Sequence, residues 1–169
     1  MDKREYCNKY FSVNRAEHDN FGDSGYPYIN DADTVYCIYK CTKDDKYYMT
    51  KQPRPSNPEG VYDLIGGTIE KGENPTIAIL RELQEEIGIE LGSVNVEKIG
   101  VFNPNVCLFK DSKIHLYYIV GAAKPNSENQ NLDTDEKIDV VPLAALYELR
   151  EKCLDLKGCI VYNYILNKD

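Results

Sequence analysis

The chain has 169 residues, of which 42% are hydrophobic and 28% are charged, and its formal net charge is −8. This length fits one domain with a single core, and no apolar run approaches the roughly 20 residues that a membrane span needs. A nucleic-acid-binding surface needs clustered Lys and Arg, so the charge argues against a nucleic-acid partner. Without an apolar leader or a CxxC pair among its six cysteines, we expect a cytoplasmic protein with free thiols, the alternative being a zinc site.

The first part of the chain is rich in strand-forming residues. Residues 1–33 are polar and tyrosine-rich with turn signals, and we expect an arm or strands there. The β-formers of 34–41 and 46–52 flank a polar turn and predict a hairpin. Two more segments are expected before the first helix: a loop at 53–60, which holds three prolines, and a short strand at 61–65.

A helix is well marked between Asn74 and Gly88. Asn74 is a good N-cap, Pro75 suits the first helical position, and Gly88 can end the helix, which predicts a helix at 75–87. After this helix we expect strands at 98–102 and 114–122, an acidic loop at 132–136, a strand at 138–141, a helix at 143–153 and a last helix or strand at 159–166.

The helix at 75–87 concentrates carboxylates on one side. At about 100° per residue, the stripe expected to face the core consists of Thr76, Leu80, Leu83 and Ile87. The other side carries three carboxylates at i, i+3 and i+4, those of Glu82, Glu85 and Glu86. Like charges at this spacing repel each other, and hard carboxylate oxygens suit Mg²⁺ or Mn²⁺ rather than zinc. The pattern therefore favours a metal site over its alternative, a solvated acidic face.

The segment from Gly67 to Ile89 resembles the Nudix box. Five residues separate Gly67 from Glu73, seven more precede Arg81, and the chain continues as Arg-Glu-Leu-Gln-Glu-Glu-Ile-Gly-Ile. The resemblance implies an α/β class fold, the Nudix α/β/α sandwich with a mixed β-sheet, in which residues 34–169 form the hydrolase domain. It also implies that the arm or strands of residues 1–33 build a homodimer that shares its active sites. One departure is Ile65, where many relatives have proline, and we expect altered loop geometry without loss of activity.

The same resemblance assigns roles to the residues of the box. It places the metal ions on the Gly67 carbonyl and on the carboxylates of Glu82, Glu85 and Glu86. Arg81 would orient these ligands, and Glu73 would brace the loop before the helix. The implied reaction is hydrolysis of a small-molecule nucleotide, in which Mg²⁺, or Mn²⁺ in its place, activates a water that attacks one phosphorus. These ions would also offset the negative charge that disfavours an anionic substrate.

Features outside the box indicate the substrate. Pro104, fifteen residues beyond Ile89, resembles the ADP-ribose pyrophosphatase branch, as do Gln52-Pro53-Arg54 and residues 135–140. We therefore expect cleavage of ADP-ribose to AMP and ribose 5-phosphate. Arg54 is either a clamp for phosphate or a solvated loop arginine. The candidates for contact with the nucleobase, each of which could instead be a core aromatic, are Tyr28, Tyr36 and Phe102.

The attacking water needs a proton acceptor. A carboxylate already bound to two cations is a poor base, so we look to the acidic loop and, by resemblance, choose Glu136, with Glu82 or Glu85 as alternatives. Two further functions stay open. One is a Nudix hydrolase for nucleoside triphosphates, dinucleoside polyphosphates or capped RNA, and the other is a regulatory domain that binds a nucleotide without catalysis.

Overall fold

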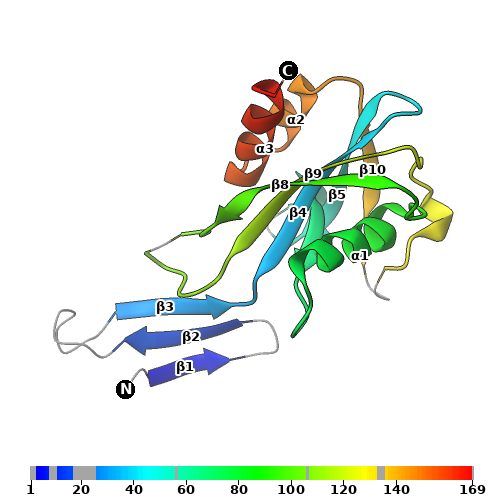
Figure 1. The fold of residues 1–169 in the computed structure, drawn as a ribbon. Helices are drawn as coiled ribbons and strands as arrows, with labels where there is room; N and C mark the ends of the chain where they lie inside the picture. Colours follow the sequence, from blue (N-terminus) through cyan, green and yellow to red (C-terminus); the bar gives the residue numbers. More distant parts are fainter. Residues whose placement is uncertain are drawn as a thin grey trace.

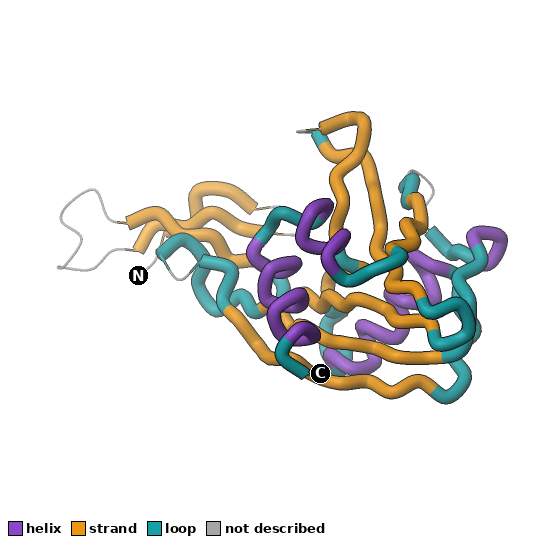
Figure 2. Tube along the Cα trace, turned by 90° about the horizontal axis from the view of Figure 1, so that it is seen from above, coloured by secondary structure: helices purple, strands orange, loops and turns teal. Residues whose placement is uncertain are grey.

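The computed structural model describes residues 3–7, 11–16, 26–55, 57–105, 107–132 and 136–168. Its first part is an antiparallel sheet of three strands, β1 (Lys3–Cys7), β2 (Phe11–Ala16) and β3 (Tyr26–Asp31). This sheet lies at one end of the molecule (Figure 1, Figure 2). Ile29 of β3 joins it to the body, because its N–H donates to the carbonyl of Leu108 at 2.7 Å and its carbonyl accepts from the N–H of Lys110 at 2.9 Å.

The main sheet has seven strands in the order β10-β5-β4-β9-β8, with β6 paired to β5 and β7 paired to β4. Its strands are β4 (Thr34–Cys41), β5 (Lys46–Arg54), β6 (Asn57–Asp63), β7 (Ile65–Thr68), β8 (Val94–Phe102), β9 (Ile114–Gly121) and β10 (Asp139–Leu143). The helices are α1 (Pro75–Ile87), α2 (Tyr147–Lys152), α3 (Leu156–Leu166) and the 3-10 helix η2 (Ser127–Asn129). Since β4 and β9 run parallel while the other pairs are antiparallel, the sheet is mixed.

Helices cover both faces of this sheet, with α1 on one side and α2 and α3 on the other (Figure 1). Ile79 and Leu83 of α1 pack with Val35 of β4 in one hydrophobic cluster. Val161 and Ile165 of α3 belong to a second cluster on the opposite face. This arrangement confirms the expected α/β/α sandwich. None of the described helices is long and apolar enough to span a membrane.

The central strands β4 and β5 separate along their length. They pair only at Tyr39, Lys40 and Cys41 of β4. The earlier half of β4 pairs instead with β7, while the later half of β5 pairs with β6. A split therefore opens in the middle of the sheet, between β7 and the outer strands.

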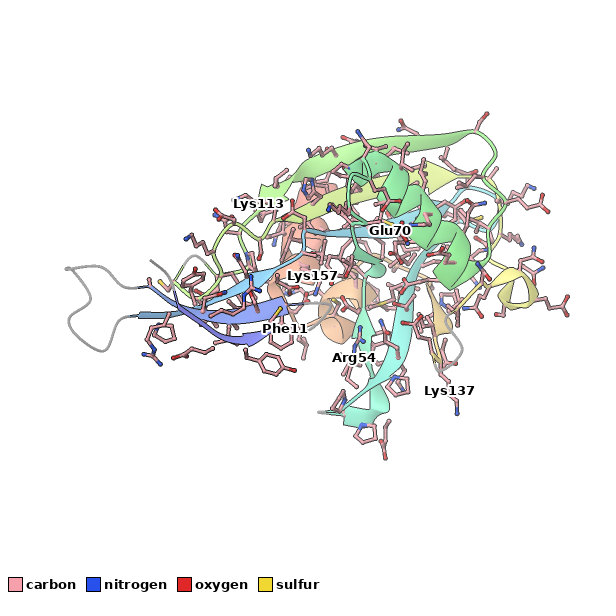
Figure 3. The ribbon with its side chains drawn as sticks, turned by 90° about the horizontal axis from the view of Figure 1, so that it is seen from below. Phe11, Arg54, Glu70, Lys113, Lys137 and Lys157 are labelled. Atoms are coloured by element: carbon pink, nitrogen blue, oxygen red, sulfur yellow. The ribbon has the colours of Figure 1, made fainter. Side chains whose placement is uncertain are left out.

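The prediction of a loop at 53–60 is wrong, because β5 continues to Arg54 and β6 begins at Asn57. Pro53 lies where the pairing register shifts between Gln52 and Arg54. Pro58 lies on β6, whose only partner among the described strands is β5. Proline is tolerated at bulges and on edge strands, so neither residue prevents this hairpin. The hairpin projects from the body and carries Arg54 (Figure 3).

The two expected helices had different outcomes. Helix α1 has the predicted bounds: the Asn74 side chain accepts from the Thr76 N–H at 2.8 Å, and Gly88 adopts φ 64°. The helix expected at 143–153 is shorter, because Leu143 still belongs to β10 and is buried there. The segment that was expected to be a helix or strand at 159–166 lies within α3.

The predicted core stripe of α1 is partly wrong. Thr76 is exposed and Leu80 half-buried, whereas Glu82 and Glu86 are buried together with Leu83. The helix is rotated so that two of its carboxylates face the sheet. The periodicity alone did not indicate this rotation, because it presumes that charged residues point to solvent.

Candidate active site

A cleft with a volume of about 670 Å³ lies at the split between β4 and β5. It is lined by Tyr36, Gln52, Arg54, Gly66, Gly67, Thr68, Glu70, Arg81, Glu82, Glu85, Glu86, Asn131, Leu132 and Glu136. The split explains how residues of α1 and residues of β4 and β5 reach the same space. The cleft therefore contains most of the site residues that the sequence predicts.

Two glycines shape the turn of β7 that faces α1. Gly66 has φ 149°, and a Cβ at this position would lie 2.0 Å from the carbonyl oxygen of Val35. A Cβ on Gly67 would lie 2.6 Å from Oε1 of Glu82. The absence of side chains thus lets β7 approach β4 closely and lets the Glu82 carboxylate pack against the backbone of Gly67.

The guanidinium of Arg81 connects the carboxylates around it. Its Nε and Nη2 donate to the two oxygens of Glu73, each at 3.0 Å. Its Nη1 donates to Glu82 and to Glu85, each at 2.8 Å, and Nη2 also donates to the carbonyl of Thr68 at 3.1 Å. These hydrogen bonds lower the pKa of Glu73. One cation therefore holds three carboxylates in place, of which Glu82 and Glu85 line the cleft and Glu73 is not among the described residues that line it.

Glu86 lies in a different environment. Its Oε2 accepts from the N–H of Gly66 at 2.9 Å. Burial raises the pKa of Glu86 to about 8, and the negative charges of Glu82, Asp63 and Glu136 add to this effect against the hydrogen bond from Gly66. Burial also raises the pKa of Glu82, against the charge of Arg81. The hydrogen bond to Glu86 and the charge of Arg81 beside Glu82 therefore do not offset the effect of burial on the pKa of either carboxylate.

The donor set fits a hard divalent cation. Several carboxylates and a backbone turn offer oxygen atoms only, and their mutual repulsion would be relieved by added positive charge. The glutamates of α1 do not converge as closely as coordinated ligands do. Among the described residues, three potential ligand atoms lie within 4.8 Å of one another only at Asp63, Cys153 and Asp155. The contacts of Arg81 and Gly66 account for this, since they draw Glu82 and Glu85 to one side and Glu86 to another.

The structure places the other predicted site residues unevenly. Arg54, Tyr36 and Glu136 line the cleft. Tyr28, Phe102 and Pro104 are not among the described residues that line the cleft. Tyr28 lies on β3, Phe102 is the last residue of β8, and Pro104 lies just beyond β8. Their roles stay predictions. Asp133 to Asp135 of the acidic loop lie outside the described residues.

The polar residues of the lining that were given no individual role from the sequence include Gln52 and Asn131. Gln52 is buried on β5 with 8% of its surface exposed. Asn131 follows η2, and its N–H donates to the carbonyl of Glu85 at 3.1 Å. Gln52 belongs to the segment Gln52-Pro53-Arg54 that resembles the ADP-ribose pyrophosphatase branch, whereas no motif marks Asn131, because it reaches the cleft only through contacts between distant segments.

The family assignment follows from this fold and this helix. The profile of the NUDIX domain matches residues 31–158 of the chain. The chain therefore belongs to the Nudix hydrolase family, as the box predicts.

Several characterised proteins are similar to the chain. The methanol dehydrogenase activator of Bacillus methanolicus is 33% identical over 132 residues, which cover 76% of this chain and 69% of that protein. The ADP-ribose pyrophosphatase of Bacillus subtilis is 29% identical over 137 residues, or 78% of this chain and 71% of that protein. The NAD-capped RNA hydrolase NudC of Pseudomonas aeruginosa is 28% identical over 123 residues, or 70% of this chain and 42% of that protein. Because these names differ in substrate, they support the family and not one branch of it.

Proposed function

We propose that this chain is a Mg²⁺-dependent hydrolase of nucleoside diphosphate derivatives, with ADP-ribose as its substrate and with Mn²⁺ able to replace Mg²⁺. The observation that carries the proposal is that one cleft contains both the glutamates around Arg81 and the pair Tyr36 and Arg54. The first group suits metal ions and the phosphates they bind. The second offers an aromatic ring for a base and a guanidinium for a phosphate.

The metal ligands that we propose are the Gly67 carbonyl and the carboxylates of Glu82, Glu85 and Glu86. When bound there, Mg²⁺ neutralises phosphate oxygens and lowers the pKa of a coordinated water. Arg81 already touches Glu82 and Glu85 and would orient both carboxylates, while Glu73 holds Arg81 from the other side. Glu73 also accepts from the N–H of Glu70, which supports a role in bracing the loop before α1.

In the proposed reaction a water oxygen bonds to one phosphorus and the bridging P–O bond breaks. ADP-ribose then gives AMP and ribose 5-phosphate, and a proton of the water passes to a carboxylate. We propose Glu136 as this base. It lines the cleft, and its charge raises the pKa values of both Glu82 and Glu86, so it faces the metal ligands without belonging to them.

For the substrate, we propose that Tyr36 contacts the nucleobase and that Arg54 binds a phosphate. Tyr28, Phe102 and Pro104 remain proposed contacts from outside the described cleft. We also propose a cytoplasmic homodimer formed through the β1–β3 sheet, with no nucleic-acid or membrane partner. A dimer that shares its active sites is the arrangement in which Tyr28 of one copy reaches the cleft of another.

The direct test is a hydrolysis screen over nucleoside diphosphate derivatives, nucleoside triphosphates, dinucleoside polyphosphates and NAD-capped RNA, with Mg²⁺ and with Mn²⁺. We expect ADP-ribose among the best substrates and triphosphates among the poor ones. A preference of about tenfold or more for a triphosphate would contradict the ADP-ribose assignment and leave the box intact. No Mg²⁺-dependent turnover of any compound would favour a regulatory domain.

Variants of the box test the metal assignment. Glu85→Gln and Glu86→Gln should each lower kcat by about a hundredfold or more while the fold stays intact, because each removes the charge of a ligand. Glu90→Gln is the matched control, since Glu90 is exposed just beyond the same helix. If either box variant turned over at the rate of the control, that residue would not be a ligand.

A further inference from the structure

Lys157, in the first turn of α3, lies against the ring of Tyr36. Its Nζ is 4.5 Å from the ring centroid, a cation–π distance. The same Nζ is 3.3 Å from Oδ1 of Asp63 and forms a second ion pair with Asp155. The Lys157 side chain is 18% exposed, so these contacts hold a largely buried ammonium in one place. Figure 3 labels Lys157, which belongs to an element remote in sequence from the Nudix box.

Tyr36 both borders the cleft and contacts this ammonium. It lines the cleft beside Gln52 and Arg54 and also packs in the hydrophobic cluster under α3. Burial raises the pKa of Tyr36, and Lys157 is the charged neighbour with the largest effect, which lowers it. The other charges that act on its hydroxyl are those of Asp63, Arg54 and Glu86. The ring therefore borders the cleft and also contacts the charge cluster that Lys157 forms with Asp63 and Asp155.

From this arrangement we propose that Lys157 is a positioning residue: it fixes the ring of Tyr36 for contact with the nucleobase of the substrate. The inference rests on the proposed function, because it needs a nucleotide in the cleft. A ring held by a cation on one face loses little rotational freedom when a base contacts it, so less binding energy is spent on ordering. Lys157 would then affect the binding of the nucleoside and not the chemistry at the phosphates.

The experiment must keep the charge around Glu86 constant when Lys157 is replaced. Removal of Lys157 alone would leave the half-buried carboxylate of Asp63 without its ion pair, and that charge acts on Glu86. The Asp63→Asn variant therefore serves as the reference, since an asparagine oxygen can still accept from the N–H of Leu64. Lys157→Met is added to this reference because methionine keeps an apolar stem and removes the charge.

We expect the double variant to show a KM for ADP-ribose about three to ten times that of the Asp63→Asn reference, with kcat within about twofold. Binding of AMP to the metal-free protein should weaken by the same factor. Lys152→Met is the matched control, because Lys152 lies 5.2 Å from the ring of Tyr62, which is not among the described residues that line the cleft. It should leave KM unchanged.

A Tyr36→Leu background separates positioning from any other effect. When this background also carries Asp63→Asn, Lys157→Met should change neither KM nor AMP binding, because the residue through which Lys157 acts is missing. An undiminished effect without Tyr36, or unchanged KM and AMP binding with Tyr36 present, would overturn the proposal. If the double variant did not fold, Lys157→Arg would decide: it should keep KM within about twofold, and a tenfold rise would count against us.

Failure of the proposed function gives a different result. In that case the wild type would hydrolyse no diphosphate in the screen, whereas a failure of the Lys157 inference leaves wild-type hydrolysis intact. If the wild type hydrolysed ADP-ribose but bound no AMP, the result would contradict the inference about Lys157 and leave the proposed function intact.

Discussion

Arg81 donates hydrogen bonds to several carboxylates at once, so a small change in its donor geometry would alter the position of each of them. Three nitrogen atoms of its side chain make five hydrogen bonds, to Glu73, Glu82, Glu85 and the backbone of Thr68. A lysine has one nitrogen and could not reach opposite sides of the cluster at once. Glu86 is the box carboxylate that receives a backbone N–H instead, and Glu136 stands apart in the acidic loop.

At the scale of single residues, the first prediction concerns Glu136 as the proposed proton acceptor. Glu136→Gln should lower kcat by about a hundredfold or more with little change in KM, because the lost interaction exists only while the proton moves. Steady-state kinetics with ADP-ribose measure both constants, and a titration of activity with Mg²⁺ should give an unchanged half-saturation concentration.

The matched control for this change is Glu128→Gln, since Glu128 is exposed in η2 and does not line the described cleft. Its kinetics should equal those of the wild type. Retention of more than about a third of wild-type kcat by the Glu136 variant would move the base into the box, to Glu82 or Glu85.

At the scale of elements, local signals predicted α1 and failed for β6. The bounds of α1 follow from Asn74, Pro75 and Gly88, which act within one turn of the chain. The strand from Asn57 depends on its pairing with β5, and prolines in the sequence conceal it. The rotation of α1 that buries Glu82 and Glu86 likewise depends on the sheet beneath, and so could not be read from the helix alone.

The start of α3 gives a prediction on pH. Asp155 caps this helix by accepting from the Gly158 N–H at 2.8 Å, and it pairs with Lys157. Burial opposes its ionisation, but these two contacts outweigh burial and lower the pKa of Asp155. A carboxylate with a lowered folded-state pKa stabilises the fold above its unfolded pKa of about 3.9, and this stabilisation disappears as the pH falls through the folded value.

Asp155→Ala should therefore lower the free energy of unfolding by about 1 kcal/mol near neutral pH and by less at about pH 3. Urea unfolding at the two pH values measures the difference. Asp155→Asn is the control, because it retains a capping oxygen that does not titrate. An alanine variant whose deficit grew as the pH fell would show that the carboxylate does not act as described.

At the scale of the whole molecule, the net charge of −8 and the cluster of buried carboxylates have the same sign. The sequence was enough to predict the family and α1, because the box is a local motif and capping residues mark both ends of the helix, and resemblance to the box implied the sandwich. It did not select Tyr36 over Tyr28 and Phe102 as the aromatic residue of the cleft, because that choice depends on where β4 and β5 separate.

The global prediction is that Mg²⁺ stabilises the fold. At about a hundred times its Kd, a ligand that binds only the native state adds about 2.7 kcal/mol to the free energy of unfolding. For a domain of this size, each 1 kcal/mol raises Tm by about 2–4 °C. Calorimetry with Mg²⁺, against potassium chloride of equal ionic strength, should show the shift. Glu86→Gln should reduce it, and an equal shift in that variant would argue against Glu86 as a ligand.

The short ladder between β4 and β5 has a mechanical consequence. Among the described strands, the β4, β7, β9 and β8 part of the sheet is paired with the β5, β6 and β10 part only at Tyr39, Lys40 and Cys41, and the chain itself joins the two parts at Leu64, between β6 and β7. Tyr36 stands on the first part and Arg54 on the second. A ligand held by both residues therefore bridges two bodies joined at one end, and it would set the angle between them. We expect amide hydrogen exchange in β5 and β6 to slow when nucleotide binds, because the ligand closes the open end of the sheet.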